Sequence, residues 1–302
     1  MTTYHDADPR ARLASDGGTA SAVKTPAQFF CFGDLAPQET TDDGNTWYVR
    51  GQNFVLALSR VRAGWAAARP NQPDEYVVLL PDRASSAHVE ANGERLQVGG
   101  LELVVVPPGS SRLTVEGNDC YVVRLFSICS TELAALSLNA AAYREPHTDV
   151  APFDPWPKSP AGYRLRRYSL DVVRDDQLRF GRIFRCSTLM VNYLYPTIGP
   201  RDTKRMSPHT HPDFEQASLA LEGEYFHHLR FPWGVDMDTW LPDDHVFCPA
   251  PSLAIIPPGA IHTSQAVGAG VNQLVDIFCP PRTDFSKQAN WVLNADEYPM
   301  PD

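Results

Sequence analysis

Short apolar runs, each about the length of one strand, recur throughout the chain of 302 residues. They are rich in Val, Ile, Leu, Tyr and Phe, and Gly, Pro, Asn and Asp separate them. Short runs bounded by such residues favour strands over helices. We therefore expect an all-β fold of the sandwich or barrel type. The clearest runs cover residues 53–61, 76–80, 101–106, 121–127, 188–195, 218–221, 252–256 and 272–278.

One stretch departs from this pattern. Residues 131–143 are rich in Ala and Leu and predict a helix, and residues 144–163 contain five prolines. A helix followed by a Pro-rich segment is typical of a connector between domains.

An internal repeat supports a division into two domains. Residues 101–112 and 251–262 each contain an apolar run, then Pro-Pro-Gly, and end at Arg112 and His262 respectively. Such self-similarity indicates two copies of one β-unit. We expect a flexible arm at 1–25, a degenerate domain without a metal site at 26–145, a Pro-rich linker at 146–162 and a metal-binding domain at 163–302.

Three histidines in the second half have the spacing of a metal site. His209 and His211 are one residue apart, so an extended segment would place both on one face. Gln216 and Gly223 follow with six residues between them, and His262 comes after the second Pro-Pro-Gly. Imidazole and amide donors of this kind suit one divalent first-row metal.

These motifs resemble those of the cupin superfamily, and the duplicated arrangement resembles a bicupin. The resemblance covers roughly residues 29–278. It implies two double-stranded β-helix barrels in tandem, joined by a short helical, Pro-rich linker. It also implies that His209, His211 and His262 hold the metal in the second barrel, whereas the first has no intact metal motif.

Two neighbouring residues compete as the fourth ligand. The spacing to Gly223 selects Gln216, whereas strand alternation would turn Glu215 inward if the barrel interior were the more apolar face. We favour Gln216, because related cupins with a Pro-x-Glu-Gln sequence use the glutamine position.

This choice has a chemical consequence. Three imidazoles and an amide are all neutral, so the metal would keep its full double positive charge and attract anionic, oxygen-chelating ligands. Iron(II) is favoured, and Mn, Ni, Zn and Cu are also compatible with these donors.

Two further residues are candidates for proton transfer. Glu215, beside Gln216, is either a base next to the metal or an exposed strand carboxylate. One imidazole of the pair His227 and His228 can point inward, and strand parity with Gln216 selects His228, provided that no turn or bulge intervenes.

Three functions are compatible with such a site. The first is a non-haem Fe(II) dioxygenase acting on a small anionic or aromatic substrate. The second is a metal-dependent isomerase or lyase of a sugar acid or keto acid. The third is a binding or regulatory bicupin without catalysis, because cupins host many unrelated functions.

Composition and charge limit the classes of partner that we expect for this chain. The net charge of −10 disfavours nucleic acid as a partner, and no run reaches the roughly 18 apolar residues of a membrane span. The N-terminal residues lack the basic-then-apolar order of a signal peptide, so we expect a cytoplasmic protein. We also expect a homodimer, the commonest closed assembly.

Overall fold

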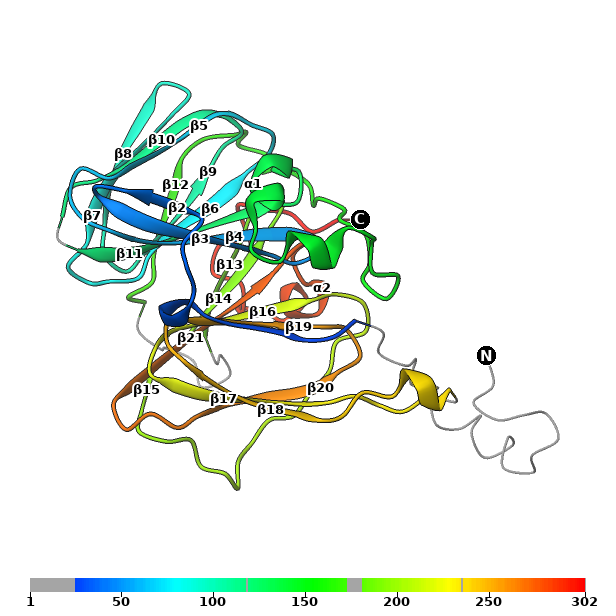
Figure 1. Ribbon diagram of the computed structural model, residues 1–302. Helices are drawn as coiled ribbons and strands as arrows, with labels where there is room; N and C mark the ends of the chain where they lie inside the picture. The colour runs from blue at the N-terminus through cyan, green and yellow to red at the C-terminus, as the bar shows by residue number, and fades with distance from the viewer. Residues whose placement is uncertain (1–24, 118, 173–180, 235, 302) are drawn as a thin grey trace. The chain divides into compact units, whose positions relative to one another are not determined.

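The computed structural model describes residues 25–117, 119–172, 181–234 and 236–301. Strands dominate these residues, and the helices among them are short (Figure 1). The prediction of an all-β fold is therefore confirmed. The predicted N-terminal arm lies outside the described residues, except for Thr25.

The chain forms two compact units, and each is assembled from several stretches of sequence. Unit 1 comprises Met1–Gly33, His147–Ala151 and Pro196–Gln273. Unit 2 comprises Asp34–Pro146, Pro152–Tyr195 and Leu274–Asp302. These stretches interleave along the chain, so the domain bounds expected from the sequence stay a prediction.

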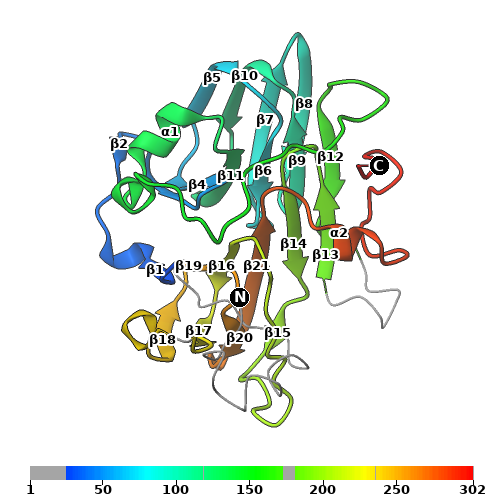
Figure 2. The same cartoon turned by 90° about the vertical axis from the view of Figure 1, so that its right-hand side faces the viewer.

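Unit 2 contains two antiparallel sheets that enclose an apolar core. The strands of the larger sheet are β2 (Glu39–Thr41), β3 (Gly44–Arg50), β4 (Phe54–Val61), β6 (Tyr76–Leu80), β9 (Glu102–Val106), β11 (Cys120–Ser127) and β12 (Arg166–Ser169). Those of the smaller sheet are β5 (Ala66–Gln72), β7 (Ser86–Ala91), β8 (Glu94–Gly99) and β10 (Gly109–Val115). Their orders are β12-β9-β6-β11-β4-β3-β2 and β5-β10-β7-β8 (Figure 2). Alternate side chains, such as Val78 and Val122, point into one buried cluster.

The remaining elements of unit 2 include a broken helix. The expected helix at 131–143 forms as α1 (Thr131–Leu136), followed by a 3-10 helix, η3 (Ala140–Tyr143). Ser137 between them has an extended backbone, which ends the first segment. Further along the chain come β13 (Gly181–Arg185), β14 (Met190–Leu194), β21 (Val271–Phe278) and α2 (Thr283–Ser286). The last residues of β21 pair with β14, Phe278 lying opposite Met190.

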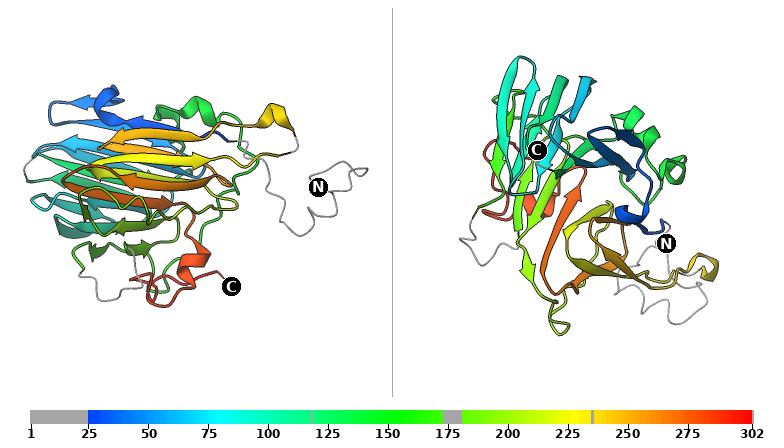
Figure 3. Two further views of the ribbon diagram at one scale, coloured as in Figure 1. Left: turned by 90° about the horizontal axis from the view of Figure 1, so that it is seen from below. Right: turned by 60° about the vertical axis from the view of Figure 1, so that its left-hand side comes forward.

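Unit 1 contains two further antiparallel sets of strands. Its elements are β1 (Gln28–Cys31), η2 (Phe32–Asp34, up to Gly33), β15 (Thr197–Ile198), β16 (Gln216–Glu222), β17 (Glu224–Arg230), η4 (Met237–Thr239), β18 (Asp244–Pro249), β19 (Ser252–Ile256), β20 (Ile261–Ala266) and the first residues of β21. One set has the order β1-β19-β16, and the other has β18-β17-β20, drawn in yellow and orange in Figure 3. Leu229, Phe231, Ala254 and Ile256 form a small apolar cluster in this unit.

The internal repeat appears in the structure with one local difference. In both copies a Pro-Pro-Gly turn joins two strands, β9 to β10 and β19 to β20. The pairing of β10 with β5 shifts register between Gly109 and Ser111. The extra residue at this shift belongs to β5, not to β10. On β10 itself, Ser111 is buried and Arg112 is exposed. At the matching position of β20, His262 is buried.

Gly223 forms the tight turn between β16 and β17. Its φ is +91°, in the left-handed region that favours glycine. A Cβ atom there would also lie 2.8 Å from the carbonyl oxygen of Val271, too close for a real contact. The glycine of the sequence motif is thus explained by backbone conformation and by space.

Candidate metal centre

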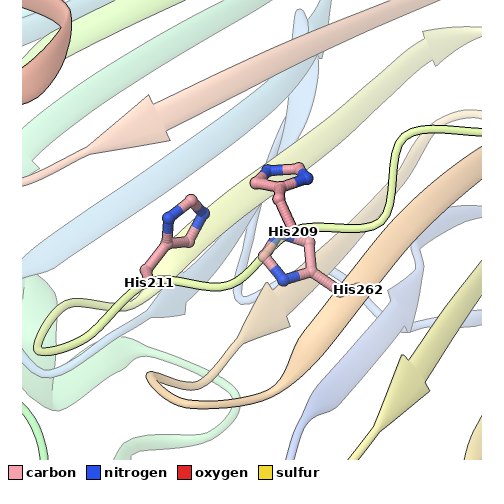
Figure 4. A group of neighbouring side chains, drawn as sticks. All are labelled: His209, His211 and His262. Carbon is pink, nitrogen blue, oxygen red and sulfur yellow. The ribbon is translucent and has the colours of Figure 1, made fainter. Parts of the chain in front are cut away.

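The structure brings the three histidines of the motif together (Figure 4). His262 lies on β20, and His209 lies beside it in an isolated bridge. The two residues exchange backbone hydrogen bonds of 3.1 and 2.8 Å, and the amide of Gly259 donates to the carbonyl of His211 at 2.6 Å. These bonds fasten the His-Thr-His segment to the strand and turn that follow Pro-Pro-Gly.

Backbone carbonyls orient two of the imidazole rings. The Nδ1 of His209 lies 3.0 Å from the carbonyl oxygen of Ser207, and the Nδ1 of His262 lies 3.0 Å from that of Ala260. Because a carbonyl only accepts, Nδ1 carries the proton in both rings, and Nε2 keeps the lone pair that a metal needs. Such supporting hydrogen bonds are characteristic of histidines that bind metal.

Gln216, at the start of β16, faces the same site. Its Oε1 lies 2.7 Å from the Nε2 of His211, and its Nε2 donates to the hydroxyl of Ser218 at 2.9 Å. The second bond fixes the amide so that its oxygen, the donor atom for a metal, faces the histidines. Opposite Gln216 and Ser218 in the sheet lie Ile256 and Ala254 of the apolar cluster, so this face of β16 is the interior one.

The geometry of the triad fits a transition metal. One nitrogen of each histidine lies within 4.8 Å of those of the other two. An ion about 2.1 Å from each nitrogen needs donors roughly 3–4 Å apart, so the rings would have to close by at most about 1–2 Å. Among the described residues, this cluster contains no carboxylate and no thiol. The residues present therefore could hold a divalent ion through neutral donors alone.

The three rings differ in exposure. His211 and His262 are buried, whereas His209 is exposed to solvent. A ligand can therefore approach the site from the side of His209, while the other two rings lie in the interior. Phe214 stacks on His211 with ring centres 4.6 Å apart and covers part of it.

The structure does not place Glu215 with the triad. This carboxylate is buried, and its Oε1 lies 3.9 Å from the Nδ1 of His147. Its neighbour in sequence, Gln216, instead contacts His211. Of the two residues considered as fourth ligand, the glutamine is the one that contacts the histidine cluster.

The structure also separates the two histidines of β17. His228 lies on the outer face, where its ring nitrogens contact the Nδ1 of His245 at 2.8 Å and the Oε1 of Gln265 at 3.0 Å. His227 is buried and pairs with Ser264, whose hydroxyl lies 2.9 Å from its Nδ1. Strand parity with Gln216 does not carry through the turn at Gly223, which is why the inward residue is one position earlier than expected.

His227 shares the interior face with His262. His227 on β17 lies opposite Ser264 on β20, and His262 comes two residues before Ser264 on the same strand. Because alternate residues of a strand share a face, His227 and His262 lie on the same face of this sheet. Burial lowers the pKa of His227 to about 4, and the nearby His262 and His228 lower it further. Its buried Nε2 makes no hydrogen bond with any described residue. The sequence signal for this position was the alternation of Tyr225, His227 and Leu229 across a single strand.

No family model and no curated protein matches this sequence. Solved structures do match. AerE from Microcystis aeruginosa has a TM-score of 0.53 at 9% identity, over 86% of this chain and 100% of that chain. The formate complex of Lactobacillus farciminis oxalate decarboxylase has a TM-score of 0.56 at 12% identity, over 95% and 99% of the two chains. A variant of Bacillus subtilis oxalate decarboxylase has a TM-score of 0.55 at 13% identity, over 86% and 78%.

These likenesses show the fold. The two-barrel β-architecture expected from the sequence is thereby confirmed. In addition, one of the two units contains a histidine cluster that could bind a metal. No helix among the described residues is both long and apolar enough to cross a membrane.

Proposed function

We propose that this chain is a metal-dependent enzyme with one divalent transition metal held by His209, His211 and His262, and with Gln216 as a fourth, exchangeable donor. The observation that carries the proposal is the neutral donor set. The cluster offers three imidazoles and, at 2.7 Å from one of them, an amide oxygen, with no carboxylate among its described members. Iron(II) suits these donors, as do Mn, Ni, Zn and Cu.

The charge of this site selects the substrate class. Because no described donor neutralises the ion, the site favours a small anion that chelates through oxygen atoms, such as an enolate, a catecholate or a keto acid. A bound metal would supply Lewis acidity and, in the case of iron, redox chemistry with dioxygen. The exposed side of His209 gives such a substrate access to the centre.

The residues of the chain would orient both the donor atoms around the ion and the bound substrate. The carbonyls of Ser207 and Ala260 hold the Nε2 atoms of His209 and His262 available for the ion. Gln216 would be a weak donor to a bound ion, and Ser218 holds its amide group in place through a hydrogen bond. His227 places a buried ring nitrogen on the interior face, where it can hydrogen-bond a substrate oxygen.

This assignment moves the expected proton-transfer role away from His228. Because His228 lies on the outer face beside His245 and Gln265, we propose His227 for the substrate contact instead. Glu215 would act only indirectly, through the adjacent Gln216, since its own side chain lies against His147. Comparison of His227→Phe with His228→Phe tests this: we expect turnover to fall about 100-fold in the first only.

The reaction class that we propose is an Fe(II)-dependent dioxygenase. A second candidate is a metal-dependent lyase or isomerase, and it is favoured by the oxalate decarboxylases among the proteins of similar fold. Oxygen uptake with catechol-like, diketone and keto-acid substrates separates the two. Uptake that requires added Fe(II) supports the dioxygenase, whereas turnover of keto acids or oxalate under nitrogen supports the lyase. Stoichiometric metal with ligand binding but no turnover in either assay would contradict an enzyme and leave a binding protein.

A further inference from the structure

The interior of unit 2 contains a buried arginine. Arg124 lies on β11 between Val122 and Phe126, which both belong to the apolar core on this face of the strand. Directly opposite it are Ala57 of β4 and Val78 of β6, which belong to the same core. Alternation along the strand therefore places the guanidinium inside the barrel, where only 4% of the residue is exposed.

This guanidinium has few partners. Its Nη2 lies 3.5 Å from the hydroxyl oxygen of Tyr48. Its Nε is buried and forms no hydrogen bond with any described residue. Its Cζ lies 5.2 Å from the ring centre of Trp65 and 6.0 Å from that of Phe126. No described carboxylate forms an ion pair with it. The hydroxyl of Tyr48 does donate to Glu39, but that carboxylate lies on the exposed strand β2.

Other buried arginines of the same unit are bonded much more fully. Arg166 forms an ion pair with Glu297 and donates to three further oxygens. Arg182 donates to the backbone carbonyls of three residues, and Arg185 donates to those of two. Arg124 differs from them, because it lies against aromatic rings and has, among the described residues, a single long contact to one hydroxyl oxygen.

Such an environment is unfavourable for an isolated cation. A guanidinium remains charged at all accessible pH values, and burying a charge without a counter-ion is costly. The described groups around it are neutral hydroxyls and aromatic rings, with no negative charge among them. The hydroxyl of Tyr76 pairs with that of Ser111 at 3.0 Å, and burial raises the pKa of this phenol and keeps it neutral. Arg69 lies over Phe126 as well, at 5.3 Å, but its charge is paired with that of Glu132.

We propose that the interior of unit 2 binds a small oxoanion of the carboxylate class, with Arg124 as its anchor. The planar fork of the guanidinium matches a carboxylate in two parallel hydrogen bonds. The buried Nε would donate one of them, and the rings of Trp65 and Phe126 would exclude water from the pair. This site lies in the unit without the histidine cluster and does not depend on the function proposed for the metal.

Formate is the probe for the experiment, with chloride at the same ionic strength as the reference. The unfolding temperature of the metal-loaded protein is measured during a titration. We expect a saturable rise of about 3 °C with formate beyond that with chloride. In Arg124→Met the difference between the two anions should disappear. Arg69→Met is the matched control, because Arg69 lies on the same aromatic ring but pairs with Glu132, and it should keep the response.

Two results of this titration would overturn the proposal, and a third can come from a lysine variant. One is a wild-type protein that responds equally to formate and chloride. The other is a formate response that persists in Arg124→Met, which would place the anion at the metal instead. Should Arg124→Met not fold, Arg124→Lys replaces it: this variant keeps the charge without the fork, and we expect at least tenfold weaker binding of formate. Unchanged affinity in the lysine variant would equally refute the bidentate anchor.

Discussion

In unit 1, the third residue after the Pro-Pro-Gly glycine is His262, which is buried and joins the histidine cluster. In unit 2 the matching residue is Arg112, which is exposed. The two units share the turn and the pair of strands around it, but the matching residues point in opposite directions, Arg112 to solvent and His262 to the interior. A repeated motif therefore does not by itself place the matching side chain in a binding site.

The interiors of the two units also differ in charge. Unit 1 presents neutral imidazole and amide donors, an arrangement that accepts a cation. Unit 2 presents the fixed cation of Arg124 among aromatic rings, an arrangement that accepts an anion. The two proposals together assign opposite ligands to one β-plan, because the strands set the positions and the side chains on their inner faces set the charge.

The largest expected effect is the loss of metal-dependent stabilisation in His262→Ala. Metal that binds only the folded protein should stabilise the wild type by about 4 kcal/mol at 1,000 times its Kd. Thermal unfolding of metal-free protein with and without added Fe(II) or Mn(II) measures this gain. His228→Ala is the control and should keep the full gain, because His228 lies on the outer face. Stabilisation that survives in His262→Ala would remove this ring from the ligand set.

Gln216→Glu tests the neutral donor set of unit 1. A carboxylate at this position would neutralise part of the ion's charge, so we expect tighter retention of metal and about tenfold weaker binding of an anionic ligand, or about 1.4 kcal/mol. Calorimetric titration of the metal-loaded proteins with a keto acid measures the change. Glu215→Gln is the matched control on the neighbouring residue. Equal anion affinity in Gln216→Glu and the wild type would mean that Gln216 does not contact the ion.

Gly223→Ala tests the turn that sets strand parity in unit 1. The substitution introduces strain at a positive φ and a contact with the carbonyl of Val271, so we expect a loss of about 2–4 kcal/mol in the free energy of unfolding. Gly199→Ala is the control. Gly199 has a φ of +79° but no neighbour within 4 Å of the added Cβ, so strain alone of about 1–2 kcal/mol should remain. Urea unfolding of both variants compares the two losses, and equal losses would show that space at Gly223 is unimportant.

The smallest expected effect is that of Arg112→His in unit 2. Because the side chain at position 112 points to solvent, a histidine there should add no metal site. Metal content should stay at that of the wild type, and the melting temperature should change by less than 1 °C or so, as for most surface substitutions. A second equivalent of bound metal would show that the identity of residue 112, and not its outward direction, distinguishes the two units.

Much of the fold and of the cluster could be predicted from the sequence, because both depend on local signals. Strand-length apolar runs predict β-structure, and the spacing of His209, His211 and His262 predicts that these residues come together. The position of His227 could not be predicted by counting from Gln216, because the turn at Gly223 interrupts the alternation between strands. A count within β17 alone would have shown that Tyr225, His227 and Leu229 share one face.

Other features depend on long-range pairing that the sequence pattern does not encode. The strand at 28–31 pairs with β19, whereas the strand at 166–169 pairs with β9, so the compact units interleave along the chain. Arg112 points outward although the matching His262 is buried, and the sequence repeat does not reveal this difference. Arg124 lies within an otherwise apolar strand, and its lack of oxygen acceptors becomes evident only when its surroundings are known.

Metal analysis of protein purified without oxygen tests the central claim most directly. Mass spectrometry of the digested wild type should find about one equivalent of a divalent first-row metal per chain, and His211→Ala should have lost it. His245→Ala, in which an outer-face histidine is removed, should retain the wild-type content. Absence of metal from all three proteins after reconstitution with Fe(II), or equal content in all three, would contradict a metal centre at the three histidines of unit 1.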